Sequence, residues 1–247
     1  MTRDCIVVTG ASRGIGAGIA LALAQQGLHV ACLSRSGALP PFSDVSPDVS
    51  ARWLPRTADV MRPDDLKTVL GALAQEGWRI VGLVNNAGLH IDAPSAELSL
   101  DEWHQVMDMN ATSVIAACQA AYPHLVSAGN ALIVNIGSFF DKLGVKRNLA
   151  YCASKAAVGA ITRCLAVEWA SKGIRVINIA PGYIHTDLNA DMIASGSLSA
   201  YLEKRIPRGR PGSAEEIGTL VATLFAHGTT FLTGETIYVD GGQGIAH

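Results

Sequence analysis

The sequence has little net charge, no basic cluster and no long apolar run. Its 247 residues carry 19 Lys and Arg against 21 Asp and Glu, which gives a formal net charge of −2, and the basic residues are scattered. A chain without a basic cluster lacks the electrostatic footprint of a nucleic-acid or membrane-surface binder, so neither kind of partner is expected. No apolar run is long enough to cross a bilayer, and no signal region precedes the first strand-like run.

Cysteine is also sparse, with five residues dispersed along the chain. An odd number without paired spacing indicates reduced thiols rather than a disulfide framework, and no metal site is predicted. Three of the cysteines lie in apolar strand or helix patterns, where we expect them to fill the core. The expected localisation is cytoplasmic.

What the sequence has is enough apolar residues for a large core and a regular alternation of elements. Hydrophobic residues make up 49% of the chain, and no linker interrupts it, so a single domain over residues 1–247 is predicted. Short apolar runs that alternate with helical patterns predict an α/β fold, a parallel sheet with helices on both faces. Seven strands are predicted, at residues 5–9, 29–34, 52–57, 80–84, 131–136, 175–179 and 236–239.

A glycine-rich turn follows the first predicted strand and precedes a helix that ends at Gly27. Glycines let backbone N–H groups and a helix N-terminus approach a pyrophosphate, so strand, turn and helix together predict a nucleotide site. A turn that is merely tight is the alternative. The turn contains three glycines, at Gly10, Gly14 and Gly16.

A second candidate site lies between residues 138 and 155. Tyr151 and Lys155 are four residues apart, so on a helix they share one face, and Ser138 follows the end of an apolar strand. A hydroxyl, a phenol and an ammonium that converge suit carbonyl reduction: the serine holds the oxygen, the tyrosine transfers a proton, and the lysine lowers the pKa of the phenol. An exposed helical pair would give the same spacing, so the context decides.

These motifs resemble those of the short-chain dehydrogenase/reductase family, and they occur in the family's order over essentially the whole chain. The matching stretches are Thr9-Gly10 with Gly14-Ile15-Gly16, Asn85-Asn86-Ala87-Gly88, Asn110, Ser138, Tyr151 with Lys155, Pro181-Gly182 and 233–242. The resemblance implies a Rossmann-like, doubly wound seven-stranded sheet. It also implies hydride transfer between a nicotinamide and a carbonyl or secondary alcohol.

The resemblance assigns roles to individual residues. The implied catalytic residues are Asn110, Ser138, Tyr151 and Lys155, with Asn110 bending its helix and positioning a water that links the lysine to solvent. The implied cofactor-binding residues are Gly10, Ser12, Arg13, Gly14, Ile15, Gly16, Ser34, Arg35, Asp59, Val60, Asn86, Ala87, Gly88, Tyr151, Lys155, Pro181, Gly182, Ile184 and Thr186. Asp59 has an alternative role as the cap of a helix that begins near Pro63.

The end of the second strand predicts which dinucleotide is used. A carboxylate there would accept from a ribose 2′-hydroxyl, but the sequence is Ser34-Arg35-Ser36. Arg35, together with Arg13 from the glycine turn, suits a 2′-phosphate, because a guanidinium matches phosphate oxygens in a forked geometry. NADP(H) is therefore expected over NAD(H). The alternative is that both arginines are solvated surface residues.

The substrate is the least determined feature. Phe139-Phe140 favours an apolar or cyclic ketone, although packing is an equally good reading, and Lys146-Arg147 leaves open a 3-oxoacyl-carrier reductase. Residues 183–205 have the composition of a lid. The candidate substrate-binding residues are His90, Ser138, Phe139, Phe140, Val145, Asn148, Tyr151, Tyr183, Leu188 and Met192.

Two further expectations concern partners and other classes of protein. The helix predicted over residues 148–171 is apolar nearly all round, so we expect it to pack, with the helix at 100–125, against the same pair of a second subunit, in a homodimer or homotetramer. A non-catalytic dinucleotide sensor should lack one of the reacting groups, and here all are present. A dehalogenase without a nucleotide is disfavoured by the intact glycine turn and Lys155.

Overall fold

The computed structural model of the protein describes residues 3–186, 197–226 and 230–246. Its central sheet has seven parallel strands in the order β3-β2-β1-β4-β5-β6-β9. The predicted parallel sheet is confirmed. The strands are β1 (Arg3–Thr9), β2 (His29–Ser34), β3 (Trp53–Thr57), β4 (Trp78–Asn85), β5 (Ala131–Ile136), β6 (Ile174–Pro181) and β9 (Thr236–Val239).

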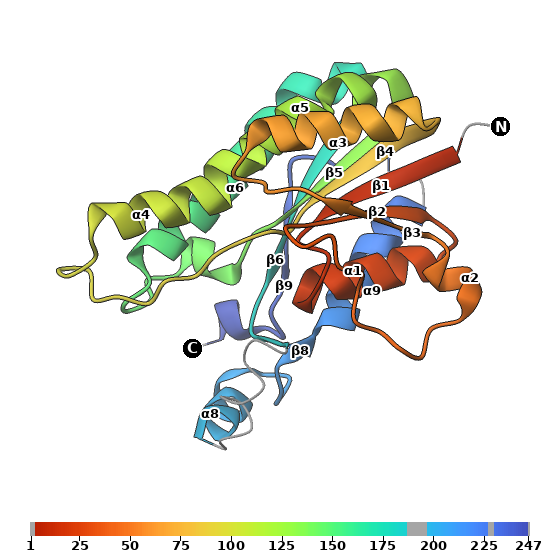
Figure 1. Ribbon diagram of the computed structural model, residues 1–247. Helices are drawn as coiled ribbons and strands as arrows, with labels where there is room; N and C mark the ends of the chain where they lie inside the picture. The colour runs from red at the N-terminus through yellow and green to blue at the C-terminus, as the bar shows by residue number, and fades with distance from the viewer. Residues whose placement is uncertain (1–2, 187–196, 227–229, 247) are drawn as a thin grey trace.

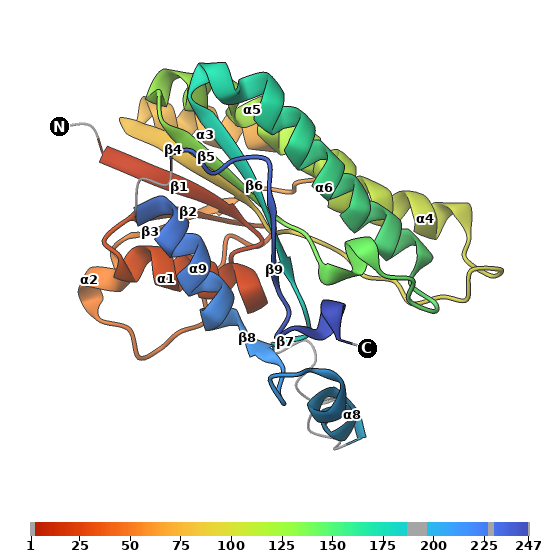
Figure 2. The same cartoon turned by 180° about the vertical axis from the view of Figure 1, so that it is seen from behind.

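Helices cover both faces of this sheet (Figures 1 and 2). On one face lie α3 (Pro63–Gln75), α5 (Ser113–Ala128) and α6 (Leu149–Trp169), and on the other lie α1 (Gly14–Gln25), α9 (Ala214–Ala226) and the short α2 (Pro47–Ser50). The strand order reverses between β1 and β4, and open sheets bind ligands at the carboxyl ends of strands beside such a point. The remaining elements are α4 (Leu100–Met107), α8 (Ser197–Arg205) and the paired short strands β7 (Ile184–His185) and β8 (Gly212–Ser213).

The apolar strands supply two hydrophobic clusters, one on each face of the sheet. In β1, Cys5 and Val7 belong to one cluster, whereas Ile6 and Val8 belong to the other. Successive strand residues point to opposite faces, and both faces are covered, so β1 reads as a continuous apolar run. Three cysteines, Cys5, Cys32 and Cys118, are buried in these clusters as predicted.

Helices α1 and α9 touch backbone to backbone at two glycines. A Cβ atom added at Gly18 would lie 2.6 Å from the carbonyl oxygen of Ala214. A Cβ atom at Gly218 would collide with the carbonyl oxygen of Gly18. Both positions therefore require glycine for the first and last long helices to approach this closely.

Two local predictions need correction. The helix predicted over residues 100–125 is interrupted by a π-helical turn at Asp108–Thr112, between α4 and α5. Asp59 does not cap α3, because the N-cap residue is Arg62 and the Asp59 carboxylate instead accepts from the Met61 backbone N–H at 3.0 Å.

The lid predicted at residues 183–205 falls partly on residues 187–196, which lie outside the described residues, so it stays a prediction. Among the described residues, no helix combines the length and the apolar composition that a membrane span requires.

Candidate active site

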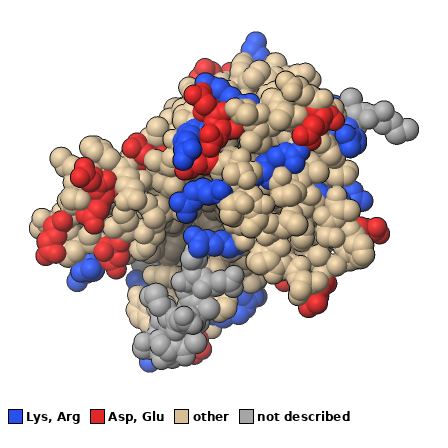
Figure 3. All heavy atoms as spheres, in the orientation of Figure 1, with Lys and Arg blue, Asp and Glu red and all other residues tan. Residues whose placement is uncertain are grey.

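A cleft of about 840 Å³ lies at the carboxyl ends of the parallel strands. It is lined by the loops that follow β1, β2, β4, β5 and β6, so segments far apart in sequence meet there. The space-filling view shows a hollow on this face with basic side chains beside it (Figure 3). Of the predicted cofactor-binding residues, all line the cleft except Gly16, which is buried under the glycine turn.

The glycine turn presents free backbone donors to the cleft. Gly10 has φ +66° and Gly14 has φ +55°, a region that L side chains rarely adopt. The N-cap residue of α1, Arg13, makes no side-chain cap hydrogen bond, and the first turn of the helix contains no acidic residue. The first turn of α1 therefore has backbone N–H groups that no side-chain cap occupies, an arrangement that suits an anion.

The loop after β4 is fixed against the glycine turn by Asn86 and Thr9. The Asn86 amide donates to the carbonyl oxygens of Thr9 and Gly10, at 3.0 and 3.2 Å. The Thr9 hydroxyl accepts from the backbone N–H groups of Asn86 and Ala87, at 3.0 and 3.1 Å. These bonds join the ends of β1 and β4 and hold the floor of the cleft in place.

The end of β2 forms another part of the cleft. Ser34 is buried, Arg35 is exposed, and both line the cleft together with Asp59 and Val60. Arg13 lines the same cleft from the glycine turn. The two guanidinium groups therefore border one opening.

Lys155 is a buried ammonium on α6, with 5% of its surface exposed. Its Nζ donates to the Ile136 carbonyl oxygen at 2.8 Å, at the end of β5. Burial lowers the pKa of Lys155 to about 8, because desolvation disfavours the charged form.

Tyr151 lies one helical turn before Lys155, and the Lys155 Nζ is 5.7 Å from the centre of its ring. Burial raises the pKa of Tyr151, and a hydrogen bond with the Ser138 side chain opposes that rise. The sequence predicts the opposite direction, a pKa lowered by the lysine. The reason for the difference is that the ammonium is directed at the Ile136 carbonyl, while the phenol is desolvated.

Asn110 joins three parts of the site from within the π-helical turn. Its side chain accepts from the Leu89 N–H and donates to the Leu89 carbonyl, both at 2.8 Å. It also donates to the Ser154 hydroxyl at 3.0 Å, which in turn donates to the Tyr151 carbonyl at 2.8 Å. Both amide groups of Asn110 are thus used in positioning the loop after β4 against α6. Its predicted role in holding a water stays a prediction.

Aromatic rings form the wall of the cleft beside Tyr151. Phe140 packs edge-on against Tyr151 and Tyr183, with ring centres 6.0 and 6.2 Å apart. Phe139 contacts Phe140 and Tyr183, at 4.8 and 5.7 Å. The phenol of Tyr151 therefore lies beside a wall of aromatic side chains in the cleft.

The comparisons with known proteins agree with this geometry. The family model described as enoyl-(acyl carrier protein) reductase matches residues 10–243. The 3β-hydroxysteroid dehydrogenase 1 of Eggerthella lenta is 34% identical over 242 residues, covering 96% of this chain and 92% of the relative. The chain belongs to the short-chain dehydrogenase/reductase family.

Other members of the family are similar over equal lengths. The 3-oxoacyl-[acyl-carrier-protein] reductase of Vibrio cholerae is 33% identical, covering 96% of each chain. The structure of a gluconate 5-dehydrogenase from Burkholderia cenocepacia J2315, in complex with NADP and tartrate, superposes with a TM-score of 0.87 at 29% identity, covering 99% of this chain and 96% of that one. These short-chain dehydrogenase/reductase relatives act on hydroxyl or carbonyl groups of diverse molecules.

The predicted substrate residues divide into three groups in this family member. His90, Ser138, Phe139, Phe140, Tyr151 and Tyr183 line the cleft. Val145 and Asn148 do not line it, although the Asn148 side chain contacts His90 from the loop before α6. Leu188 and Met192 lie outside the described residues.

Eight residues that line the cleft are absent from the predicted site residues, namely Leu33, Ser36, Ala58, Leu89, Gln105, Met109, Ile136 and Gly137. Gln105 on α4 and Met109 in the π-helical turn both line the cleft. Gln105 and Met109 are four residues apart, so a shared helix face is the signal that links them.

Proposed function

We propose that the protein is an NADPH-dependent reductase of a small apolar or cyclic ketone, acting reversibly on the corresponding secondary alcohol. The observation that carries this function is the phenol of Tyr151, which is bonded to Ser138 and lies beside aromatic rings in the cleft. A raised pKa keeps the phenol protonated at neutral pH, which is the state required of a general acid in reduction.

The cleft fits a phosphorylated dinucleotide. The uncapped N-terminus of α1 and the glycine turn suit the pyrophosphate, and Arg13 with Arg35 suits a 2′-phosphate. The NADP bound to the Burkholderia cenocepacia relative supports the same cofactor. Among the described residues, no cluster of His, Cys, Asp or Glu is suited to a metal ion.

The nicotinamide supplies the hydride when it is bound. Ser138 and Tyr151 then bond the substrate oxygen, and Tyr151 gives it a proton as negative charge develops there. Lys155 has one ammonium hydrogen engaged by the Ile136 carbonyl, and its other hydrogens would bond the ribose hydroxyls of a bound cofactor. Asn110 keeps the backbone of Leu89 and the start of α6 in register with these groups.

A 3-oxoacyl-carrier reductase is the second candidate, supported by the Vibrio cholerae relative. Basic residues in the loop before α6 would bind the phosphate of an acyl carrier. One of them, Arg147, forms an ion pair with Asp92 at 2.6 Å between Nε and Oδ1, which weakens this candidate. The aromatic wall favours a free ketone instead.

The function is tested by steady-state oxidation of NADPH, and separately of NADH, with a panel of small ketones, cyclic diketones and acyl thioesters. We expect turnover with NADPH and cyclic ketones. Turnover of thioesters alone would support the carrier reductase. Tight NADPH binding with no turnover on the panel would favour a dinucleotide sensor, and failure to bind either nucleotide would contradict the proposal.

Tyr151→Phe tests the proposed acid directly, because it removes the phenolic hydroxyl and keeps the ring. We expect turnover to be abolished while NADPH affinity, measured by fluorescence titration, stays nearly intact. Residual activity within about tenfold of the parent would contradict the role of Tyr151 as the acid, since general acid catalysis contributes at least about a hundredfold.

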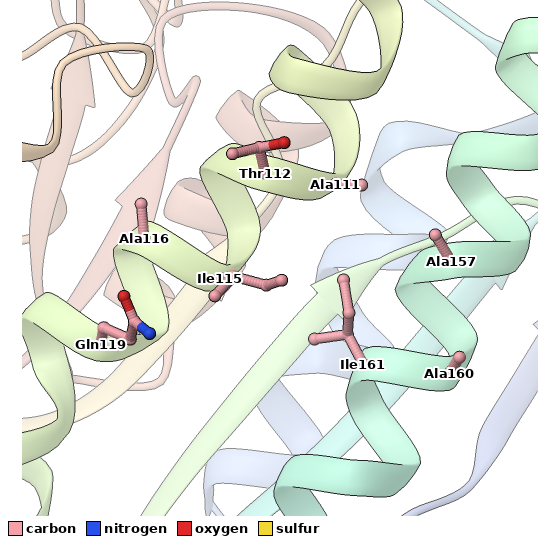
Figure 4. A pocket seen from close by; sticks show the side chains of 8 residues that line it. All are labelled: Ala111, Thr112, Ile115, Ala116, Gln119, Ala157, Ala160 and Ile161. Atoms are coloured by element: carbon pink, nitrogen blue, oxygen red, sulfur yellow. The ribbon is translucent and has the colours of Figure 1, made fainter.

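We also propose that the enzyme assembles as a homotetramer in the cytoplasm, with α5 and α6 forming one contact. A groove of about 420 Å³ between these helices has an almost wholly apolar lining (Figure 4). Ile115 is 40% exposed, and Val167 on α6 is 84% exposed. An apolar helical face of this kind supports a second copy as its partner. The lining residues are Ala111, Thr112, Ile115, Ala116, Gln119, Ala157, Ala160 and Ile161. Five free cysteines support the cytoplasmic location.

A further inference from the structure

The loop after β4 is joined to the loop before α6 by contacts beyond the cleft itself. Asp92 and Arg147 form the ion pair, and the Ala93 backbone N–H donates to the Arg147 carbonyl at 3.0 Å. Arg147 has φ +66°, a left-handed conformation that a non-glycine residue rarely adopts. The two loops therefore hold each other in one defined arrangement next to Tyr151.

Within this arrangement, His90 contacts Asn148 in a way that fixes its tautomer. The Asn148 Nδ2 donates to the Lys146 carbonyl at 2.9 Å, which orients the amide and leaves Oδ1 as an acceptor. His90 Nε2 contacts that Oδ1, so Nε2 is the nitrogen that carries the proton. In the neutral ring, Nδ1 is then an acceptor.

The His90 ring lies beside the reacting group. It packs edge-on against Tyr151, with ring centres 4.9 Å apart, and it lines the cleft. The preceding residue, Leu89, is held through both its backbone groups by Asn110. A substrate oxygen bonded to the Tyr151 hydroxyl thus places the neighbouring substrate carbon near an imidazole of fixed position and fixed tautomer.

We propose that His90 is a specificity-determining residue whose Nδ1 accepts a hydrogen bond from a hydroxyl group on the carbon next to the substrate carbonyl. The substrate class is accordingly a cyclic or apolar α-hydroxy ketone. This inference rests on the proposed reductase function. Ethers and second ketones have no proton to donate to Nδ1, and the Phe139 and Phe140 rings of the neighbouring wall provide no such acceptor.

The test compares two probes that differ by one hydroxyl, 2-hydroxycyclohexanone and cyclohexanone, each reduced with NADPH under the same conditions. His90→Phe keeps a ring beside Tyr151 and removes both nitrogens. We expect kcat/KM to fall about tenfold for the hydroxy ketone, the loss of one hydrogen bond, and to change less than about threefold for cyclohexanone. His104→Phe, on the exposed side of α4, is the matched control and leaves both values unchanged.

Asn148→Leu is the second variant, because it removes the group that fixes the tautomer and leaves His90 in place. We expect a selective loss in the same direction but smaller, with NADPH affinity close to the parent value. Equal losses on both probes in His90→Phe would show that His90 acts only through Tyr151 and would overturn the inference, as would no loss on either.

Failure of the function itself gives a different result. A parent enzyme that reduces neither probe, nor any ketone of the panel, overturns the reductase and with it the role of His90. A parent that reduces both probes, with a His90→Phe variant that keeps the same ratio between them, overturns the role of His90 alone.

Discussion

Lys155 is a buried ammonium with one protein hydrogen bond, and burial lowers its pKa to about 8. Its titration therefore makes the stability of the protein depend on pH. Below pH 8 the folded and unfolded chains both carry the proton. Between pH 8 and the ordinary value of 10.5 the unfolded chain binds more protons, so the contribution of this residue to stability rises with pH in that window.

Lys155→Met removes this titration. We expect the free energy of unfolding of the parent, relative to the variant, to increase between about pH 8 and 10.5 by an amount on the order of a few kcal/mol. Urea unfolding of both proteins at a series of pH values measures it, and parallel curves would contradict it. The comparison between parent and variant is needed because burial also raises the pKa values of Cys5, Cys32 and Cys118 to about 12. These thiols make stability fall as the pH rises, and they do so equally in both proteins.

Arg35 is the residue on which the cofactor prediction depends. Arg35→Asp replaces the expected phosphate contact with a carboxylate that accepts from a ribose 2′-hydroxyl and repels a 2′-phosphate. We expect the ratio of kcat/KM for NADPH to that for NADH to fall by at least about tenfold, the effect of losing a charge-assisted contact. Lys172→Asp, an equal change of charge at an exposed residue of the turn after α6, serves as the control. An unchanged ratio would return Arg35 to the role of a solvated surface residue.

At the scale of elements, the π-helical turn between α4 and α5 places Asn110 where it reaches both Leu89 and Ser154. Asn110→Leu keeps the volume and removes three hydrogen bonds, leaving the Leu89 backbone groups without these partners. We expect a loss of about 3 kcal/mol in the free energy of unfolding, roughly 1 kcal/mol per bond, together with a large loss of turnover. Chemical denaturation measures the first effect. Thr112→Ala, in the same turn, is the control, and equal destabilisation by both would indicate a role for the turn rather than for the asparagine.

Strands could be predicted because burial on both faces produces continuous apolar runs, and β5, whose residues are all buried, was predicted with the bounds it has. The π-helical turn could not, because one extra residue in a turn barely disturbs an apolar stripe that continues from Val106 to Val114. Contacts between segments far apart in the sequence could not be predicted either. Asp92 with Arg147, and His90 with Asn148, are 55 and 58 residues apart and carry no local signature.

The order of the reacting residues along the chain was predictable because the motifs are short and local. The direction of the Tyr151 pKa was not, because it depends on how completely the phenol is buried and on where the Lys155 ammonium points. The spacing of Tyr151 and Lys155 places both side chains on one helix face, but it does not specify which backbone carbonyl accepts from the Lys155 ammonium.

At the scale of the whole molecule, the exposed apolar face of α5 and α6 is where assembly is expected. Ile115→Arg places a charge in the middle of the groove in Figure 4. We expect the mass measured by light scattering to fall below that of the parent, because burying an unpaired guanidinium opposes the contact. Gln26→Arg, exposed at the end of α1, is the control. A parent protein with the mass of one chain would contradict the proposed assembly.

The backbone contact between Gly18 and Gly218 links residues that the ribosome makes far apart in time. The two positions are separated by 200 residues (218 − 18), or about 10–40 s of synthesis at about 5–20 residues per second. During that interval the nascent chain has made the glycine turn and α1 but lacks the helix that α1 packs against. The packing of α1, which is made among the first residues to emerge, is therefore completed only after α9 has been made.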